Sequence, residues 1–285
     1  MLHTPPRPYR ATSYALPSAP LSYAQRVSTP DGAQLATFVY GTMRSDSDPV
    51  LALHGNGGSH ATFAAVIERL VAAGLAVVAF DARAQGQSTR GTAPLTYEQL
   101  ATDAITVLDH LGVTKVHVLG HSDGGIEGLL LARDQGDRVA SLVAGGANLT
   151  PEGVIDEWDT EGSANRSRAW ATWVREHPLP SSIDPTLLPS ATSVSIDAEL
   201  LQLMLDEPHI EAASLASITC PTCVLVGEHD CITQEETQAI AQAIAQARLV
   251  VVPKVGHSLP RLAPDSVALQ VLTNVMLAKG ARAHT

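Results

Sequence analysis

Short apolar runs alternate with amphipathic stretches along most of the chain. Continuous apolar runs of about four to eight residues, bounded by turn signals, are typical of strands buried on both faces of a parallel sheet. The pattern predicts such strands at residues 49–55, 75–81, 115–120, 138–145, 222–228 and 248–253. Helices are expected at residues 60–74, 96–111, directly after Ser122, at 234–247 and at 264–278. This alternation predicts a doubly wound α/β sheet.

An antiparallel hairpin is expected before the alternation begins. The β-rich stretches 23–29 and 33–41 are joined by Pro30-Asp31-Gly32. Proline supplies the fixed φ and glycine the positive φ that a hairpin turn uses. With the later runs, the hairpin predicts a sheet in which most strands are parallel.

The alternation breaks between residues 150 and 217, where prolines and short amphipathic pieces replace it. All three tryptophans, Trp158, Trp170 and Trp173, fall in this segment. We therefore expect an N-terminal leader at 1–22, a core formed by 23–149 and 218–285, and a helical cap inserted at 150–217. Because binding sites are usually apolar and aromatic, the tryptophans are candidate substrate contacts. Trp170 and Trp173 lie three apart and are equally suited to packing the insertion onto the core.

Composition narrows the classes of partner. A hydrophobic content of 45% with 16% charged residues is typical of a globular domain. The formal charge of −11 opposes binding to nucleic acid or to an anionic membrane surface, which both need clustered Lys and Arg. No run approaches the roughly 18 apolar residues of a membrane helix, and residues 1–20 lack the apolar core of a secretory signal. A cytoplasmic protein with a small-molecule partner is expected.

The three cysteines, Cys220, Cys223 and Cys231, are an odd number and do not predict a disulfide framework. Cys220 and Cys223 have the CxxC spacing of a redox or zinc pair. No second ligand pair follows them, so buried thiols beside a strand are the favoured interpretation. No metal is expected.

The chemistry is predicted to centre on Ser122. Residues 120–124 fit G-x-S-x-G between a predicted strand and a predicted helix, which is the context of a nucleophile elbow. Glycines on both sides allow the strand and the helix to approach closely. If Asp123 were the nucleophile, a small residue would be expected at His121, so Ser122 is the predicted nucleophile.

A serine hydroxyl needs a base, and the base needs an orienting acid. Asp230 follows the strand at 222–228, and His257 follows the next one. The carboxyl ends of parallel strands share one edge of a sheet, so both side chains are expected beside Ser122. Glu228 is the rival acid, but its position two residues earlier favours a place within or against the strand end.

The oxyanion that forms on the substrate needs two donors. One is expected from the backbone N–H of Asp123, at the start of a helix, where the helix dipole also helps. The other is expected from the loop 54–59, with the N–H of Asn56 as the best candidate. A phosphate-binding loop is not predicted, because neither GxGxxG nor GxxxxGK[ST] is present.

These features together resemble the α/β-hydrolase superfamily from about Tyr23 onward. The resemblance rests on His54-Gly55, residues 81–88, the elbow, Asp230 and His257. It implies an eight-stranded, mostly parallel sheet and a cap between the sixth strand and its helix. Relatives usually carry glycine where this chain has Ala84, a departure in a loop that affects no predicted catalytic residue.

The motifs behind this resemblance are specific for the fold but say little about the substrate. The leading interpretation is a serine hydrolase of small carboxylic esters or lactones, working through an acyl-enzyme and needing no cofactor. C–C bond hydrolysis of ring-cleavage products and a non-catalytic ligand receptor remain open. The Ser-Asp-Gly-Gly turn also resembles the valacyclovir-hydrolase-like branch, which implies an α-amino acid ester whose ammonium group binds Asp123. Two further roles of the Asp123 carboxylate stay open: internal hydrogen bonding or helix capping, and electrostatic tuning of His257.

Overall fold

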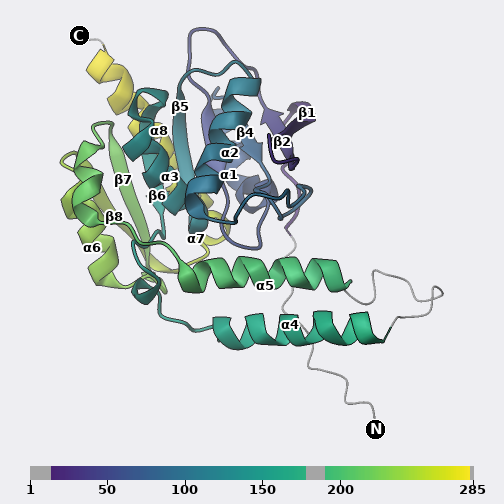
Figure 1. Ribbon diagram of the computed structural model, residues 1–285. Coiled ribbons are helices and arrows are strands. Elements are labelled where there is room, and N and C mark those ends of the chain that lie inside the picture. Colours follow the sequence, from purple (N-terminus) through teal and green to yellow (C-terminus); the bar gives the residue numbers. More distant parts are fainter. Residues whose placement is uncertain (1–13, 178–189, 283–285) are drawn as a thin grey trace.

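The computed structural model describes residues 14–177 and 190–282, and its sheet contains eight strands (Figure 1). The strands are β1 (Leu21–Ser28), β2 (Gln34–Tyr40), β3 (Val50–Leu53), β4 (Val77–Phe80), β5 (Val116–His121), β6 (Val139–Gly145), β7 (Thr222–His229) and β8 (Ala247–Gly256). Their order is β1-β2-β4-β3-β5-β6-β7-β8. Pairs β1–β2 and β2–β4 are antiparallel, and the others are parallel. The predicted fold class is confirmed.

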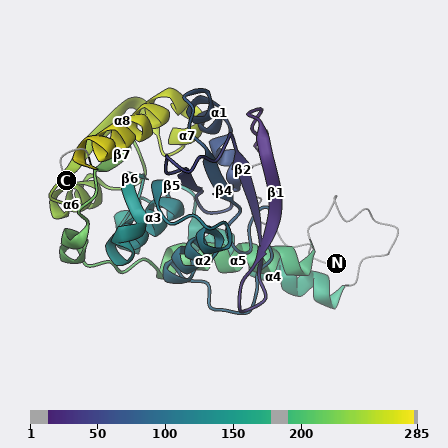
Figure 2. The same cartoon turned by 90° about the horizontal axis from the view of Figure 1, so that it is seen from above.

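Helices cover both faces of the sheet. The α-helices of the described residues are α1 (Ala64–Ala72), α2 (Tyr97–His110), α3 (Asp123–Asp134), α4 (Thr160–Glu176), α5 (Ala191–Asp206), α6 (Gln234–Ala243), α7 (Leu259–Leu262) and α8 (Pro264–Arg282). Short 3₁₀ segments occupy His60–Phe63, Gly136–Arg138, Pro151–Gly153 and Ala212–Ser217. Helices α1, α7 and α8 pack on one face of the sheet, and α2, α3 and α6 pack on the other (Figure 2).

The central strands show why the apolar runs are continuous. All four residues of β3 and all four of β4 are buried, because helices cover both of their faces. A core cluster lies on each face of the sheet, one around α2 and α3 and the other around α1 and α8. Alternating polar residues would leave unsatisfied groups in one of these clusters.

The last strand is longer than the sequence predicts. The apolar pattern ends at Pro253, but β8 continues to Gly256. Strand β8 is at the edge of the sheet and pairs with β7 only. A proline is tolerated on an edge strand because its missing N–H need not remove a ladder hydrogen bond. The extension matters because it carries the chain to His257.

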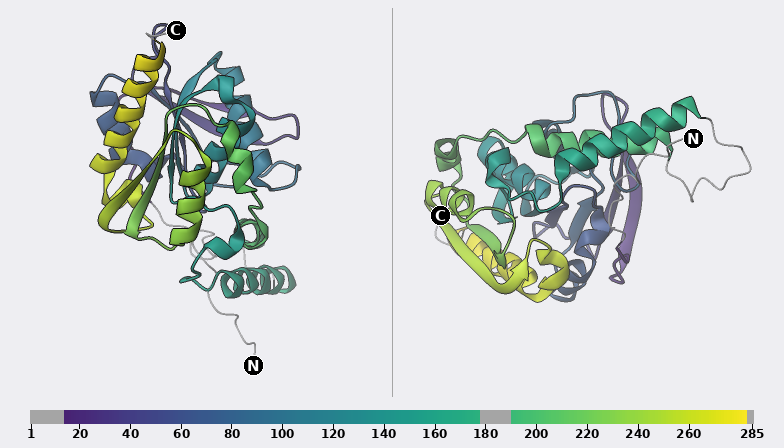
Figure 3. Two further views of the ribbon diagram at one scale, coloured as in Figure 1. Left: turned by 90° about the vertical axis from the view of Figure 1, so that its left-hand side faces the viewer. Right: turned by 90° about the horizontal axis from the view of Figure 1, so that it is seen from below.

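The segment expected to form a cap contains the antiparallel pair α4 and α5. Figures 1 and 3 show these helices side by side beyond the end of the sheet, outside its two helical layers. Trp170, Ala171 and Val194 form a small apolar cluster between them. Residues 178–189 of the predicted cap and 1–13 of the predicted leader lie outside the described residues. The domain boundaries at 22, 150 and 217 remain predictions.

Candidate active site

Ser122 occupies a sharp turn between β5 and α3. Its backbone has φ 56° and ψ −123°, a conformation that costs a non-glycine residue about 1–3 kcal/mol. A Cβ at Gly120 would lie 1.9 Å from the carbonyl oxygen of Gly124, and one at Gly124 would lie 2.0 Å from that of Leu53. Neither position has room for a side chain. The strand and the helix therefore approach as closely as the predicted elbow requires.

His257 lies within hydrogen-bonding distance of both residues that are expected to cooperate with it, Ser122 and Asp230. His257 Nε2 is 2.9 Å from Ser122 Oγ, and His257 Nδ1 is 2.7 Å from Asp230 Oδ1. The backbone N–H of Ile232 also donates to Asp230 Oδ1 at 3.1 Å. Asp230 follows β7 and His257 follows β8. Because these strands are neighbours in the sheet, the two residues lie side by side. Their catalytic roles remain a proposal.

The charges of His257 and Asp230 stabilise each other. Burial alone lowers the pKa of His257, but its hydrogen bond to Asp230 and the negative charge there raise that pKa above the ordinary 6.5. Burial alone raises the pKa of Asp230, but the hydrogen bond and positive charge of His257 hold that pKa below 3.8. Asp230 is therefore ionised at neutral pH and suited to orient the imidazole and stabilise its cation.

Glu228, the rival acid, lies elsewhere. Its side chain is exposed, and its Oε2 accepts a hydrogen bond of 2.7 Å from the backbone N–H of Lys254. The carboxylate is thus tied to the β7–β8 edge. The geometry favours Asp230 as the partner of His257.

A cavity of about 320 Å³ opens in front of Ser122. Ser122 and His257 form part of its wall, together with Asn56 from the loop after β3 and Leu201 and Met204 from α5. A cavity of this size is at the lower end of the range for small-molecule sites, about 300–1,000 Å³. The helices of the predicted cap thus help to enclose the serine.

The tryptophans have different positions. Trp158 lines the cavity, and the centroid of its ring is 6.0 Å from that of His257. Among the described residues that line the cavity, neither Trp170 nor Trp173 is found. Trp170 is 4% exposed and packs between α4 and α5, while Trp173 stacks on His177. For Trp170 this position accords with the packing alternative. Substrate contact by any of the three tryptophans remains a prediction.

The loop after β3 lies directly against the serine. A Cβ at Gly55 would be 2.8 Å from the Cβ of Ser122, so the next residue, Asn56, is close to the reacting atom. The Asn56 side chain donates to the Asp123 carboxylate at 3.1 Å and to the Leu200 carbonyl at 2.9 Å. Donation of the Asn56 and Asp123 backbone N–H groups to an oxyanion remains a prediction.

The Asp123 carboxylate is buried and accepts hydrogen bonds within the protein. Tyr97 Oη and Asn56 Nδ2 each donate to it at 3.1 Å, and the residue is 3% exposed. Burial raises the pKa of Asp123 to about 6, although both hydrogen bonds oppose this shift. Of its three expected roles, internal hydrogen bonding is confirmed. Tuning of His257 and binding of an ammonium group remain predictions.

Sequence reasoning missed a second, smaller cavity behind the serine. It has a volume of about 20 Å³, and Asp123, Glu207, Cys231 and His257 contribute to its wall. Tyr97 also lines it, from a helix that precedes the elbow in the chain. A signal existed for Cys231, which directly follows the predicted acid. No local pattern links Tyr97 or Glu207 to Ser122, because only the packing of α2 and α5 brings them there.

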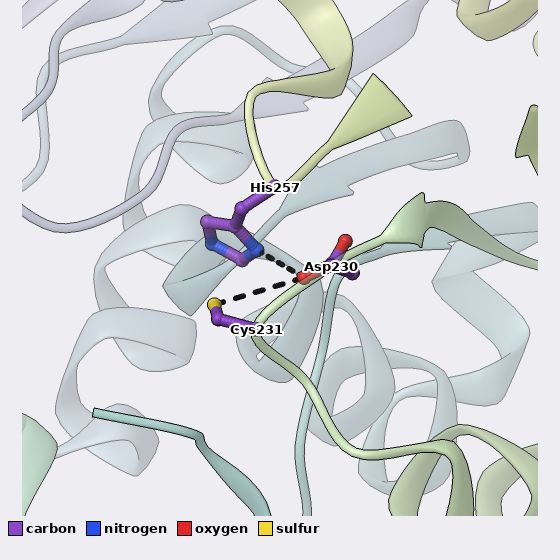
Figure 4. Close-up of side chains that lie close together, drawn as sticks. All are labelled: Asp230, Cys231 and His257. Carbon is purple, nitrogen blue, oxygen red and sulfur yellow. Dashed lines mark hydrogen bonds and ion pairs between the residues drawn. The ribbon is translucent and has the colours of Figure 1, made fainter. Parts of the chain in front are cut away.

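The cysteines are all free thiols, in accordance with the sequence. Cys223 is buried and Cys220 is partly buried beside β7. Within residues 14–177 and 190–282, one group of three potential metal ligands has its ligand atoms within 4.8 Å of one another: Asp230, Cys231 and His257 (Figure 4). Cys220 and Cys223 are not part of it. Across the same residues, no helix is both long and apolar enough to cross a membrane.

Comparisons with known proteins agree with this architecture. A sequence model described as the alpha/beta hydrolase family matches residues 50–270. The chain is 28% identical to the "Putative carbamate hydrolase RutD" of Caulobacter sp. (strain K31), over 82% of this chain and 92% of that one. It is 26% identical to the rhodomycin D methylesterase DauP of Streptomyces sp. (strain C5), with the same two coverages. A solved thermophilic esterase from Thermogutta terrifontis superposes with a TM-score of 0.68 at 26% identity, covering 90% of this chain and 99% of that one.

Proposed function

Because the chain belongs to the alpha/beta hydrolase family, we propose that it is a serine hydrolase that cleaves a small carboxylic ester or lactone. The observation that carries the proposal is the continuous hydrogen-bonded line from Ser122 Oγ through His257 to Asp230, at 2.9 and 2.7 Å. This line ends at a cavity of about 320 Å³ that can admit a small acyl group. A nucleophile, a base and an orienting acid are the parts that acyl transfer requires.

In the first half of the reaction, Ser122 Oγ attacks the substrate carbonyl carbon while His257 Nε2 takes the hydroxyl proton. Asp230 holds the other ring nitrogen and stabilises the imidazolium. The negative charge on the carbonyl oxygen is received by the backbone N–H groups of Asn56 and Asp123. His257 then returns the proton to the leaving alcohol, and the acyl group remains on Ser122.

Water completes the cycle by the same route. His257 Nε2 accepts a proton from the water, whose oxygen attacks the acyl carbon, and Ser122 leaves with that proton. In a lactone the leaving alcohol stays attached to the acyl chain, so ring opening gives one product. The small volume of the cavity, bounded by Trp158 and Met204, favours short acyl groups.

The named relatives support this class of chemistry. RutD is named for carbamates, DauP for a methyl ester, and the Thermogutta protein is called an esterase. Each of these names implies attack on a carbonyl carbon that carries a heteroatom leaving group. A carboxylic ester is the substrate that needs the fewest additional groups beyond those found around Ser122.

A second candidate is hydrolysis of an α-amino acid ester. The observation that favours it is the small cavity behind Ser122, whose wall includes the carboxylates of both Asp123 and Glu207. The α-ammonium group of such a substrate is one carbon away from the acyl carbon. It would place a positive charge within reach of the buried carboxylate of Asp123 and the partly buried one of Glu207, where a dielectric below that of water strengthens the attraction.

A matched substrate panel separates these candidates. Hydrolysis rates are measured for p-nitrophenyl acetate, a small lactone, a ring-cleavage dienone, and an alanine ester beside its propionate analogue. The proposal expects hydrolysis of acetate or lactone that is lost in Ser122→Ala. A preference for the alanine ester over propionate identifies the second candidate, and turnover of the dienone alone contradicts both.

A further inference from the structure

Cys231 places a thiol beside the proposed base and acid. Its Sγ is 3.7 Å from Asp230 Oδ1, and the same oxygen is 2.7 Å from His257 Nδ1 (Figure 4). The three potential ligand atoms all lie within 4.8 Å of one another. The proposed hydrolytic reaction gives this sulfur no task, since attack, proton transfer and orientation are all assigned to other atoms.

The arrangement has the dimensions of a zinc site. A tetrahedral Zn²⁺ with ligands at about 2.0–2.3 Å requires ligand atoms about 3.3–3.8 Å apart. The sulfur–oxygen distance already lies in this range. The nitrogen–oxygen distance is shorter because a proton joins those atoms, and it must widen by under about 1 Å when an ion takes the proton's place.

The small cavity behind Ser122 borders two of the three proposed ligands. Its volume of about 20 Å³ is close to that of one water molecule, and Cys231 and His257 both line it. The carboxylates of Asp123 and Glu207 contribute to the same wall. An ion in this cavity therefore meets a thiol and an imidazole beside acidic residues, which favour a cation.

We propose that Asp230, Cys231 and His257 form an inhibitory binding site for Zn²⁺ or a similar thiophilic divalent ion. The ion binds Cys231 Sγ as thiolate, His257 Nδ1 and a carboxylate oxygen of Asp230, and water fills the fourth position. Mg²⁺ and Ca²⁺ are disfavoured, because they prefer oxygen ligands to thiolate and imidazole. The ion is a regulator of the site and takes no part in hydrolysis.

Inhibition follows from the position of one proton. When the ion binds, the thiol releases its proton to solvent, and the neutral imidazole exchanges its Nδ1 proton for one on Nε2. Nε2 is the atom 2.9 Å from Ser122 Oγ. Once it carries a proton it cannot accept another from the serine, so the base is blocked. For a thiol and a neutral imidazole, one Zn²⁺ binds and one proton leaves, which raises the net charge of the site by one.

The test uses purified full-length protein stripped with EDTA. Zn²⁺ is titrated against p-nitrophenyl acetate hydrolysis in wild type, in Cys231→Ser and, as a control, in Cys223→Ser, whose thiol lies in β7 outside the ligand group. Each protein is compared with its own metal-free rate, with Mg²⁺ in parallel. We expect EDTA-reversible inhibition of wild type and Cys223→Ser. In Cys231→Ser the inhibition constant should rise at least about tenfold, since even loss of an outer-shell partner weakens metal binding by about 10–100-fold.

Spectroscopy makes the result independent of the proposed hydrolysis. Co²⁺ bound by the site should give a thiolate-to-metal charge-transfer band in wild type and Cys223→Ser that is absent in Cys231→Ser, even if no ester is cleaved. The proposal is overturned if Co²⁺ gives no such band in folded wild-type protein, or if Zn²⁺ inhibits Cys231→Ser as strongly as wild type.

Discussion

The side chains of Asn56 and Asp123, the two residues expected to donate backbone N–H groups to an oxyanion, are joined by a hydrogen bond of 3.1 Å. Asn56 belongs to the loop after β3, and Asp123 is the first residue of α3. The bond links the two segments directly beside Ser122. It therefore holds the two proposed donors at a constant spacing, which is the preorganisation that oxyanion stabilisation needs.

Asn56→Ala tests this link. The backbone N–H remains, but the loop loses its bonds to Asp123 and to the Leu200 carbonyl. We expect kcat to fall by about tenfold, less than the 10²–10³-fold known for removing a whole oxyanion donor, with little change in KM. Steady-state kinetics on a p-nitrophenyl ester measure both. A rise in KM alone would assign Asn56 to ground-state binding.

Asp123→Asn tests the buried carboxylate through stability. The pKa of Asp123 is raised from 3.8 to about 6, mainly by burial. Its stabilising effect is therefore fully present below about pH 3.8 and is lost as the pH rises through 6. We expect the difference in unfolding free energy, variant minus wild type, to increase by about 2 kcal/mol between pH 4 and pH 8. Urea unfolding at several pH values checks this, and a constant difference contradicts it.

The pH dependence of hydrolysis tests the His257–Asp230 pair. The base must be neutral, and its pKa is raised above 6.5 by Asp230. In wild type, kcat/KM should rise with pH through an apparent pKa above 6.5. Asp230→Asn should move this midpoint to lower pH and reduce kcat by about 10⁴-fold, the loss found for the equivalent change in another triad. Initial rates of both proteins as a function of pH measure the midpoint. An unchanged midpoint would show that Asp230 does not raise the pKa of His257.

The glycines of the elbow yield a stability prediction. A Cβ at Gly124 would lie 2.0 Å from the Leu53 carbonyl oxygen, whereas one at Gly280 in α8 meets nothing within 4 Å. Gly124→Ala must push α3 away from β3, and we expect it to cost more than about 3 kcal/mol or to abolish folding. Gly280→Ala, the matched control, should be stabilising by about 0.5–1 kcal/mol. Thermal unfolding compares the two, and equal effects would contradict the close approach at the elbow.

Much of the fold follows from local pattern. The central strands are predictable because burial on both faces leaves continuous apolar runs, as in β3 and β4. The proximity of Asp230 and His257 to Ser122 is predictable for a related reason, since parallel strands deliver their carboxyl ends to one edge. The apolar run ends at Pro253, three residues before β8 does, because edge position is a property of the sheet and not of the strand's own sequence.

The remainder of the site depends on packing between distant elements. Tyr97 reaches Asp123 because α2 packs beside α3, and no spacing in the sequence records this contact. Trp170 is a candidate contact by residue type alone, but its packing against Val194 of α5 depends on how the two helices pair, which no local pattern records. The backbone conformation of Ala84 is likewise not predictable from the sequence. Its φ of 69° lies in the region that favours glycine, yet the residue type alone does not reveal that conformation.

The central claim is that Ser122 is a nucleophile activated by His257. The most direct measurement is labelling of the folded protein with a fluorophosphonate, followed by intact mass and peptide mapping. We predict one adduct, on Ser122, absent in Ser122→Ala and formed at least about 10³-fold more slowly in His257→Ala. Folded protein that takes up no label, or takes it up on another residue, would contradict the account.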